Sequence, residues 1–114
     1  MKDCLFCKIA SGEIPSQKVY EDKDIFAFND IKPQAPTHVL IVPKKHIDKL
    51  SSLKGTDAEL VGKMLLAANK IAKDNGLNGS GYRIVGNCGQ DAGQLVFHIH
   101  LHLIGGRKFG WPPG

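Results

Sequence analysis

The sequence has no hydrophobic run long enough to cross a lipid bilayer. A membrane-spanning helix needs about 20 consecutive apolar residues, and no apolar run in the 114 residues approaches that length. The first residues, MKDCLFCKIA, also contain too short an apolar stretch for a signal peptide. We therefore expect a cytoplasmic protein with no membrane partner.

A concentrated basic segment is also missing. Fifteen Lys and Arg residues against eleven Asp and Glu give a net charge of +4, but the basic residues are scattered and never exceed two in a row, as at Lys44-Lys45. Nucleic-acid grooves usually combine a basic stripe with aromatic stacking residues. We therefore expect no nucleic-acid partner, and the weak positive excess suits a small anionic ligand.

Cysteine is scarce, and the odd count of three argues against a disulfide framework. Cys4 and Cys7 form a C-x-x-C pair, whereas Cys88 stands alone. The sequence also shows no internal repeat, no low-complexity segment and no dividing linker. Because single domains most often contain roughly 100–150 residues, we treat residues 1–114 as one domain.

One long helix is expected at about residues 57–74. Thr56 and Glu59 have the spacing of a capping box, in which two side chains satisfy free backbone N–H groups reciprocally. Apolar residues then recur every three or four positions, as one buried face of a helix requires. Asn75-Gly76 supplies the stop, because Gly readily adopts the left-handed conformation that ends helices.

Short segments rich in β-branched and aromatic residues predict strands around this helix. The longest ends at a pair of glycines. Five expected strands and one long helix indicate an α+β meander, with the helix packed on one face of the sheet. The five segments are residues 18–21, 25–28, 38–42, 82–85 and 95–104.

The last expected strand contains three of the five histidines in the chain. Side chains alternate between the faces of a strand, so His98, His100 and His102 share one face. The apolar residues Phe97, Ile99, Leu101 and Leu103 share the other face, which should pack under the helix. A straight strand separates the Cα atoms of His98 and His102 by about 13 Å, so the three rings cannot converge comfortably on one metal ion.

The C-x-x-C pair offers a role for one end of this histidine row. A tetrahedral zinc site formed by Cys4 and Cys7 needs two more ligands, and His46 and His98 are the best candidates. The alternative is that both cysteines are reduced residues, partly buried in an N-terminal turn. The other two histidines of the row then remain for nucleophilic attack or proton transfer near pH 7, unless they merely face solvent.

A polar, Gly-rich segment, residues 86–94, precedes the histidine row. Its composition is typical of a loop whose backbone approaches a ligand closely. It lacks the G-x-x-x-x-G-K-[ST] pattern of a P-loop and opens no helix.

Residues 98–104, HIHLHLI, follow the pattern H-φ-H-φ-H-φ-φ, where φ is apolar, and so resemble the signature of the histidine-triad (HIT) superfamily. The likeness extends over nearly the whole chain and points to the HINT branch, the histidine-triad nucleotide-binding proteins. It rests on the segments GEIP, DI, PQAPTH, PKKH, GQ and WPPG, at residues 12–15, 30–31, 33–38, 43–46, 93–94 and 111–114.

The resemblance implies a five-stranded antiparallel sheet with one long helix, in a homodimer whose two sheets join. It also implies a purine nucleoside phosphoramidase, which hydrolyses the P–N bond of AMP or GMP conjugates through a nucleotidyl-histidine intermediate. By position, His100 is the nucleophile, and His102 and His38 contact the phosphate and position the reacting groups. Imidazoles and backbone N–H groups can meet the charge of the phosphate, so no catalytic cofactor is required.

For the nucleoside, the resemblance implies that Asp30 holds the ribose hydroxyls. It also implies an apolar slot for the base, although core packing explains its members equally well. The slot consists of Phe6, Ile14, Phe28 and Ile31. The rest of the expected nucleotide site consists of Asn87, Gly93, Gln94, His98, His100 and His102.

Two further properties come from the resemblance. Many HIT proteins hold a structural zinc ion, with ligands that would correspond to Cys4, Cys7, His46 and His98. Many HINT proteins carry Ser where Leu95 stands, placed to donate a hydrogen bond near the leaving group. Leucine cannot donate, so the rate or the leaving-group preference should differ.

Three other functions stay open at this point. The same histidine would serve a hydrolase of dinucleoside polyphosphates. The protein would also fit a nucleotide-binding or scaffolding role in which hydrolysis is incidental. A purely metal-binding module would lose its fold on chelation and bind no nucleotide. In a dimer, residues 107–114 are expected to reach the other subunit and shape its site.

Overall fold

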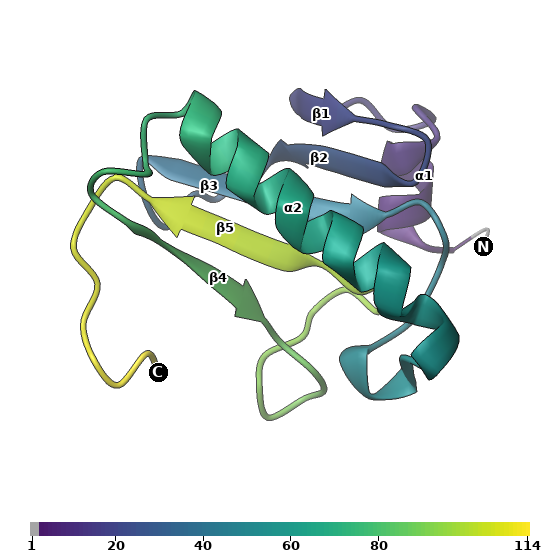
Figure 1. Ribbon diagram of the computed structural model, residues 1–114. Coiled ribbons are helices and arrows are strands. Elements are labelled where there is room, and N and C mark those ends of the chain that lie inside the picture. Colours follow the sequence, from purple (N-terminus) through teal and green to yellow (C-terminus); the bar gives the residue numbers. More distant parts are fainter. Residues whose placement is uncertain (1–2) are drawn as a thin grey trace.

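The computed structural model describes residues 3–114, and this part of the chain forms a five-stranded antiparallel sheet in the order β1-β2-β3-β5-β4 (Figure 1). Met1 and Lys2, the first residues of the expected domain, lie outside the described residues. The strands are β1 (Lys18–Glu21), β2 (Ile25–Asn29), β3 (Thr37–Pro43), β4 (Tyr82–Gly86) and β5 (Leu101–Gly105). The helices are α1 (Leu5–Ala10) and α2 (Ala58–Asp74), with 3-10 turns at Leu50–Ser52 and Gly55–Asp57. The expected α+β fold is confirmed, but the expected meander is wrong, because β5 lies between β3 and β4.

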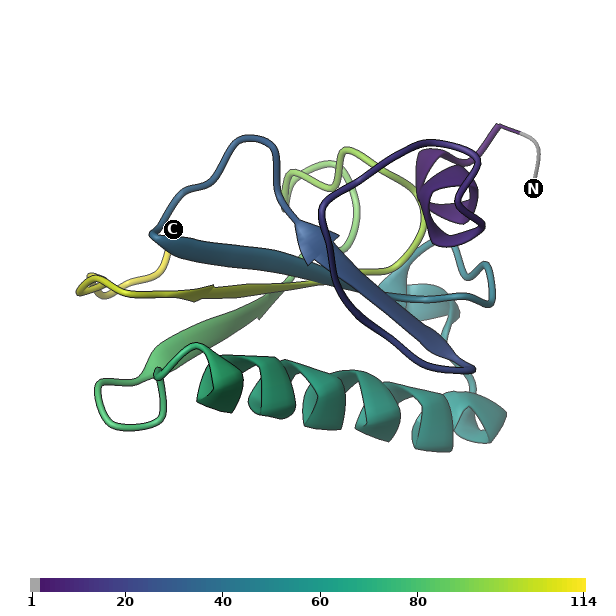
Figure 2. The same cartoon turned by 90° about the horizontal axis from the view of Figure 1, so that it is seen from above.

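The long helix α2 lies along one face of the sheet and closes the main core (Figures 1 and 2). Its inward side chains include Met64, Ala68 and Ile71, which pack with Ile41 of β3 and Leu103 of β5. None of these five residues is more than 2% exposed. Burying apolar surface stabilises a fold by roughly 25 cal/mol per Å². This core is the larger of the two and should therefore contribute most of the hydrophobic stabilisation.

The short helix α1 lies on the opposite face, over a second and smaller core (Figure 2). The side chains of β2 contribute to both cores, because successive side chains of a strand point to opposite faces of the sheet. Ile25 and Ala27 belong to the core under α2, whereas Phe26 and Phe28 belong to the core under α1. The sequence analysis did not predict α1, whose six residues are too few to show a helical period.

The helix predicted at 57–74 is confirmed as α2, but the predicted capping box is wrong. The carboxylate of Asp57, not the side chains of Thr56 and Glu59, occupies the start of the helix. Asp57 accepts the backbone N–H of Lys54 at 2.9 Å, and its other oxygen lies 2.9 Å from Nζ of Lys45. A 3-10 turn precedes the helix and moves the cap from the position that the local pattern indicated.

The predicted strand at 95–104 is wrong in its first half, because β5 begins only at Leu101. Leu101 pairs with Ile41 of β3, so continuing this register would set Ile99 opposite Pro43. Proline has no N–H to donate to a ladder. The backbone N–H of Ile99 instead donates to the carbonyl of Ile47 at 2.7 Å, and His98 and His100 lie outside the strand.

The alternation of faces nevertheless persists through this segment. Ile99 and Leu103 are buried in the core under α2, and Leu101 packs against that core. The side chains of His100 and His102 lie on the other face, where their ring centroids are 5.0 Å apart. Phe97 is the exception to the prediction, because its side chain is 51% exposed.

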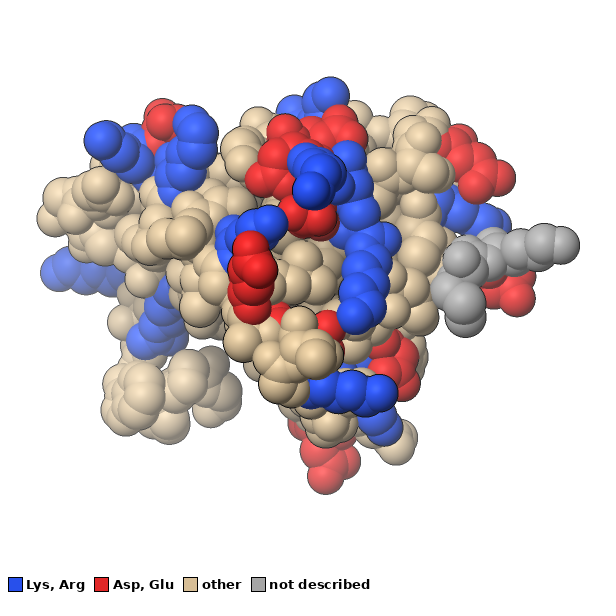
Figure 3. Space-filling view, turned by 45° about the vertical axis from the view of Figure 1, so that its right-hand side comes forward, with Lys and Arg blue, Asp and Glu red and all other residues tan. Residues whose placement is uncertain are grey.

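Among the described residues, no helix has both the length and the hydropathy needed to cross a bilayer. On the face shown in Figure 3, acidic and basic side chains lie next to one another.

Candidate functional site

Cys4, Cys7, His46 and His98 converge on one point, where their ligand atoms all lie within 4.8 Å of one another. Nδ1 of His98 lies 3.3 Å from Sγ of Cys4 and 3.4 Å from Sγ of Cys7. Nδ1 of His46 lies 3.5 Å from Sγ of Cys7 and 3.2 Å from Nδ1 of His98. A tetrahedral zinc ion has S···N edges of about 3.6 Å and N···N edges of about 3.3 Å, so the four side chains fit this ion.

The surroundings of His98 prepare its ring for metal binding. The Nε2–H group donates to the carbonyl of Pro43 at 2.7 Å, which leaves the lone pair on Nδ1 aimed at the two sulfur atoms. Burial lowers the pKa of His98, so the ring stays neutral. Burial and the adjacent Cys4 thiol raise the pKa of the Cys7 thiol. A cation at the centre of these donors would oppose that effect.

His100 follows directly, and its ring is oriented by the backbone of His98. Its Nδ1–H group donates to the His98 carbonyl at 2.8 Å, which leaves Nε2 unprotonated. The edge-to-face ring of Phe6 lies 5.0 Å away, and only 8% of His100 is exposed. Burial lowers the pKa of His100. The arrangement holds a neutral imidazole with one free lone pair.

His38 and His102 form a second oriented pair. The backbone N–H of Gln34 donates to Nδ1 of His38 at 3.0 Å, so Nε2 of His38 carries the proton. This group donates to Nδ1 of His102 at 2.9 Å and lies 3.4 Å from a carboxylate oxygen of Asp30. Nε2 of His102 is therefore an N–H donor. Burial, followed by the neighbouring His100 and His38, lowers the pKa of His102 to about 4.

His100 and His102 line a cavity of about 350 Å³ on the face of the sheet that α1 covers. Most of the expected nucleotide site lies in its wall. The expected residues found there are Phe6, Phe28, Asp30, Ile31, Asn87, Gly93, His100 and His102. Leu95, which the resemblance placed near the leaving group, also lies in the wall, and the residues of the wall that the sequence analysis missed are Leu5, Ile9, Leu40 and Val96. The face of α1 formed by Leu5, Phe6 and Ile9 is the signal that could have revealed part of this wall.

Four expected site residues do not line the cavity: His38, His98, Ile14 and Gln94. His38 is buried behind His102, and His98 is buried among the metal ligands. Ile14 packs on the small core under α1.

Gln94 is buried, and backbone groups occupy its amide. Its Oε1 accepts the N–H of Gly89 at 2.9 Å, and its Nε2 donates to the carbonyls of Asp48 and Val96 at 2.8 and 3.1 Å. Gln94 therefore fixes the Gly-rich loop, residues 86–94, in place beside the cavity.

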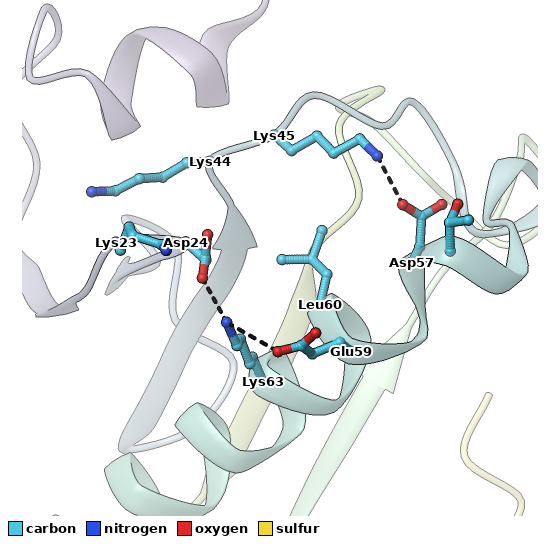
Figure 4. A pocket seen from close by; sticks show the side chains of 9 residues that line it. Lys23, Asp24, Lys44, Lys45, Asp57, Glu59, Leu60 and Lys63 are labelled. Atoms are coloured by element: carbon cyan, nitrogen blue, oxygen red, sulfur yellow. Dashed lines mark hydrogen bonds and ion pairs between the residues drawn. The ribbon is translucent and has the colours of Figure 1, made fainter.

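A second hollow, of about 420 Å³, lies beside the start of α2 and has a different character (Figure 4). Its lysines are largely neutralised by carboxylates. Lys45 pairs with Asp57 at 2.9 Å, and Lys63 pairs with Asp24 at 2.8 Å. The residues that line it include no histidine and no cysteine. The histidine-lined cavity is therefore the candidate active site.

Comparison with known proteins identifies the family of the chain. The model of the HIT domain family matches residues 11–109. A 14 kDa zinc-binding protein of Zea mays is 48% identical over 112 residues, which cover 96% of this chain and 87% of that protein.

Solved structures show the same fold. A HIT family hydrolase from Legionella pneumophila superposes with a TM-score of 0.97 at 56% identity, covering 98% of this chain and 100% of the other. A histidine triad nucleotide-binding protein from Candida albicans superposes with a TM-score of 0.83 at 37% identity, covering 96% and 83%. By its sequence match, its sheet and its histidine cluster, the chain belongs to the HIT domain family.

Proposed function

We propose that the chain is a hydrolase that cleaves the P–N bond of purine nucleoside 5′-phosphoramidates and releases AMP or GMP. The observation that carries the proposal is the fixed tautomer of His100. Its Nδ1 proton is held by the His98 carbonyl, and its free Nε2 belongs to a ring that lines the cavity. A neutral imidazole in this state is a good nucleophile toward phosphorus.

The rest of the cavity suits a nucleoside monophosphate. Phe6, Phe28 and Ile31 offer apolar surface for a purine base, and Ile31 is 92% exposed, so a ligand could cover it. Asp30 lies in the same wall, and its carboxylate can accept hydrogen bonds from ribose hydroxyls. Asn87 and Gly93 line the same cavity as His100 and would meet the phosphate.

The proposed reaction has two steps. Nε2 of His100 attacks the α-phosphorus of a substrate whose bridging nitrogen is protonated, and the P–N bond breaks as its electron pair leaves with that nitrogen as the neutral amine. The imidazole then carries a positive charge, which the bond from Nδ1–H to the His98 carbonyl stabilises. In the second step water attacks phosphorus, the bond to Nε2 breaks, and AMP or GMP leaves while the proton of the water passes to solvent.

The oriented pair His38–His102 stabilises charge on the phosphate. Because His102 is neutral and carries its proton on Nε2, it donates a hydrogen bond without ionising. A donor fixed before the substrate arrives costs no reorganisation during the reaction. His38 acts through His102, since it holds the tautomer of that ring.

The metal centre has a structural role in this proposal. Cys4, Cys7, His46 and His98 would hold a zinc ion that crosslinks the N-terminal segment to the sheet, and no reaction step passes through it. The name of the maize relative, a 14 kDa zinc-binding protein, supports the presence of zinc. Reduced cysteines of this kind suit the cytoplasm, where we place the protein.

We also propose a homodimer in which two sheets join. The strand β4 is at the edge of the sheet and pairs only with β5 among the described strands. An unpaired edge exposes backbone groups that a second copy can satisfy. The C-terminal residues 107–114 would then reach the partner's site.

Turnover of two substrates tests the reaction class. Adenosine 5′-phosphoramidate and diadenosine tetraphosphate are each incubated with the protein, and release of AMP is followed, with His100→Ala as the control. The proposal expects rapid turnover of the phosphoramidate that is lost in the variant. Turnover of the tetraphosphate alone would assign the protein to the dinucleoside polyphosphate hydrolases. Binding without turnover of either would indicate a nucleotide-binding or scaffolding protein.

A further inference from the structure

We propose that the Cys4–Cys7–His46–His98 centre positions the catalytic cavity as well as stabilising the fold. By holding α1 against the sheet, metal ligation fixes one wall of the nucleotide site and the orientation of His100. The inference rests on the proposed function for the identity of the ligand, a purine nucleotide. The four metal ligands are therefore positioning residues, which act on the substrate through α1 and His98.

The helix α1 has little capacity to hold its own shape. It contains six residues, whereas isolated helices shorter than about 12 residues are marginal in water. Both sulfur ligands lie at its start. Cys4 is the residue that caps the helix, and the backbone N–H of Cys7 points to its Sγ at 3.4 Å. Binding both sulfur atoms to one ion would fix the first turn.

The same helix supplies a wall of the cavity. Leu5, Phe6 and Ile9 all line it. The Phe6 ring lies 5.6 Å from the ring of Phe28 and 5.0 Å from the ring of His100, in edge-to-face contacts. A displacement of α1 therefore changes the slot for the base and the packing of the nucleophile together.

His98 provides a second connection between the Cys4–Cys7–His46–His98 centre and the proposed nucleophile, His100. Its ring contributes Nδ1 to the metal ligands, while its backbone carbonyl accepts the Nδ1 proton of His100 at 2.8 Å. The side chain of His98 is fully buried and is held on its other nitrogen by the Pro43 carbonyl. Metal ligation would thus restrain the residue whose carbonyl selects the reactive tautomer of His100.

Apolar packing alone holds α1 less firmly. Phe6 and Ile9 rest on the small core that includes Phe26, Leu40 and Val42. Such contacts are non-directional, so without the centre the helix would stay near the sheet but sample several positions. If the docked position were populated one time in ten, the apparent affinity for nucleotide would fall about tenfold.

Cys7→Ser tests the inference, with Cys88→Ser as the matched control that removes a thiol outside the centre. AMP affinity of the zinc-loaded protein is measured by calorimetry before and after chelation, and amide hydrogen exchange is compared between α1 and α2. Nitrogen chemical shifts of the His100 ring report its tautomer. Cys7→His, which restores a ligand, serves as the rescue.

The expected result is a loss of AMP affinity of about tenfold and fast exchange confined to α1, on chelation and in Cys7→Ser. A mixed tautomer of His100 should accompany it. Cys88→Ser should match the parent, and Cys7→His should recover affinity with zinc. Unchanged affinity and unchanged exchange in α1 would overturn the inference. So would an equal rise in exchange in α1 and α2, because that result indicates a global stabilising role only. If AMP does not bind even the zinc-loaded protein, the proposed function fails instead, and the exchange and tautomer measurements still decide the inference.

Discussion

Two backbone groups determine the protonation pattern of three histidines in the candidate active site. The carbonyl of His98 accepts a hydrogen bond from Nδ1–H of His100, and the N–H of Gln34 sets the tautomer of His38 and, through it, that of His102. The result is a free lone pair on His100 beside an N–H donor on His102. The sequence identifies these rings as a group, but it cannot reveal their tautomers, because the peptide groups that set them become neighbours only in the folded chain.

The depressed pKa of His102 predicts a loss of stability in acid. The pKa is about 4 in the folded protein and about 6.5 in the unfolded chain. The unfolded state therefore binds more protons between these values, and stability falls as the pH falls through this window. The loss should be about 2 kcal/mol after allowance for partial exposure.

Denaturant unfolding at pH 7 and at pH 4 measures this effect, with His102→Asn as the control. Asparagine keeps an acceptor for His38 but does not titrate, so the variant should lose less stability than the parent over the same window. An identical pH dependence in the two proteins would contradict the assignment.

Leu95 predicts a limit on the reaction rate. Its side chain is 90% exposed in the wall of the cavity and cannot donate a hydrogen bond. Leu95→Ser would add a donor, and one hydrogen bond of about 1 kcal/mol corresponds to roughly a fivefold increase in rate. We expect this increase in kcat/KM for alkylamine leaving groups. Leu95→Ala is the control for the shortened side chain, and equal rates in the two variants would contradict the role of the hydroxyl.

At the scale of secondary-structure elements, local sequence patterns predicted the elements better than their ends. The helical period predicted α2 almost to its limits, because its buried face repeats through 17 residues. The ends depend on non-local partners. Asp57 closes the 3-10 turn that leads into the helix, with Lys45 beside it, and Pro43 ends the pairing that would have extended β5. Short-range patterns contain neither contact.

The hydrogen bond from the Lys54 N–H to the Asp57 carboxylate predicts which substitutions near the start of α2 destabilise the protein most. Asp57→Ala removes the acceptor of the Lys54 N–H and should lower the free energy of unfolding by about 1–2 kcal/mol. Thr56→Ala and Glu59→Ala should each change it by less than about 0.5 kcal/mol, as surface substitutions usually do. Urea unfolding of the three variants measures the ranking. A larger effect at Thr56 than at Asp57 would favour the capping box that the sequence indicated.

At the scale of the whole molecule, one face of the sheet carries the larger core and the other carries the candidate active site. The face under α2 holds the larger core, and the face under α1 holds the histidines, the candidate metal ligands and the cavity. The histidine motif and the C-x-x-C pair predicted most of this second face. Of the wall formed by α1, only Phe6 was predicted, because six residues give too short a helical pattern to identify the helix and Leu5 and Ile9 with it.

The edge strand β4 predicts the assembly state. Sedimentation should give twice the chain mass of 12.4 kDa. Alternate amides of an edge strand point away from its neighbour, so in a dimer with joined sheets all β4 amides should be protected from hydrogen exchange. A monomer mass, with every second β4 amide exchanging freely, would contradict the proposed dimer.

The configuration at phosphorus tests the central claim most directly. A phosphoramidate of adenosine with a chiral phosphorothioate centre is hydrolysed in isotopically labelled water, and the configuration of the product is determined. Attack by His100 followed by attack by water makes two in-line displacements, so the account predicts retention. Inversion would mean that water attacks the substrate directly, and His100 would then not be the nucleophile.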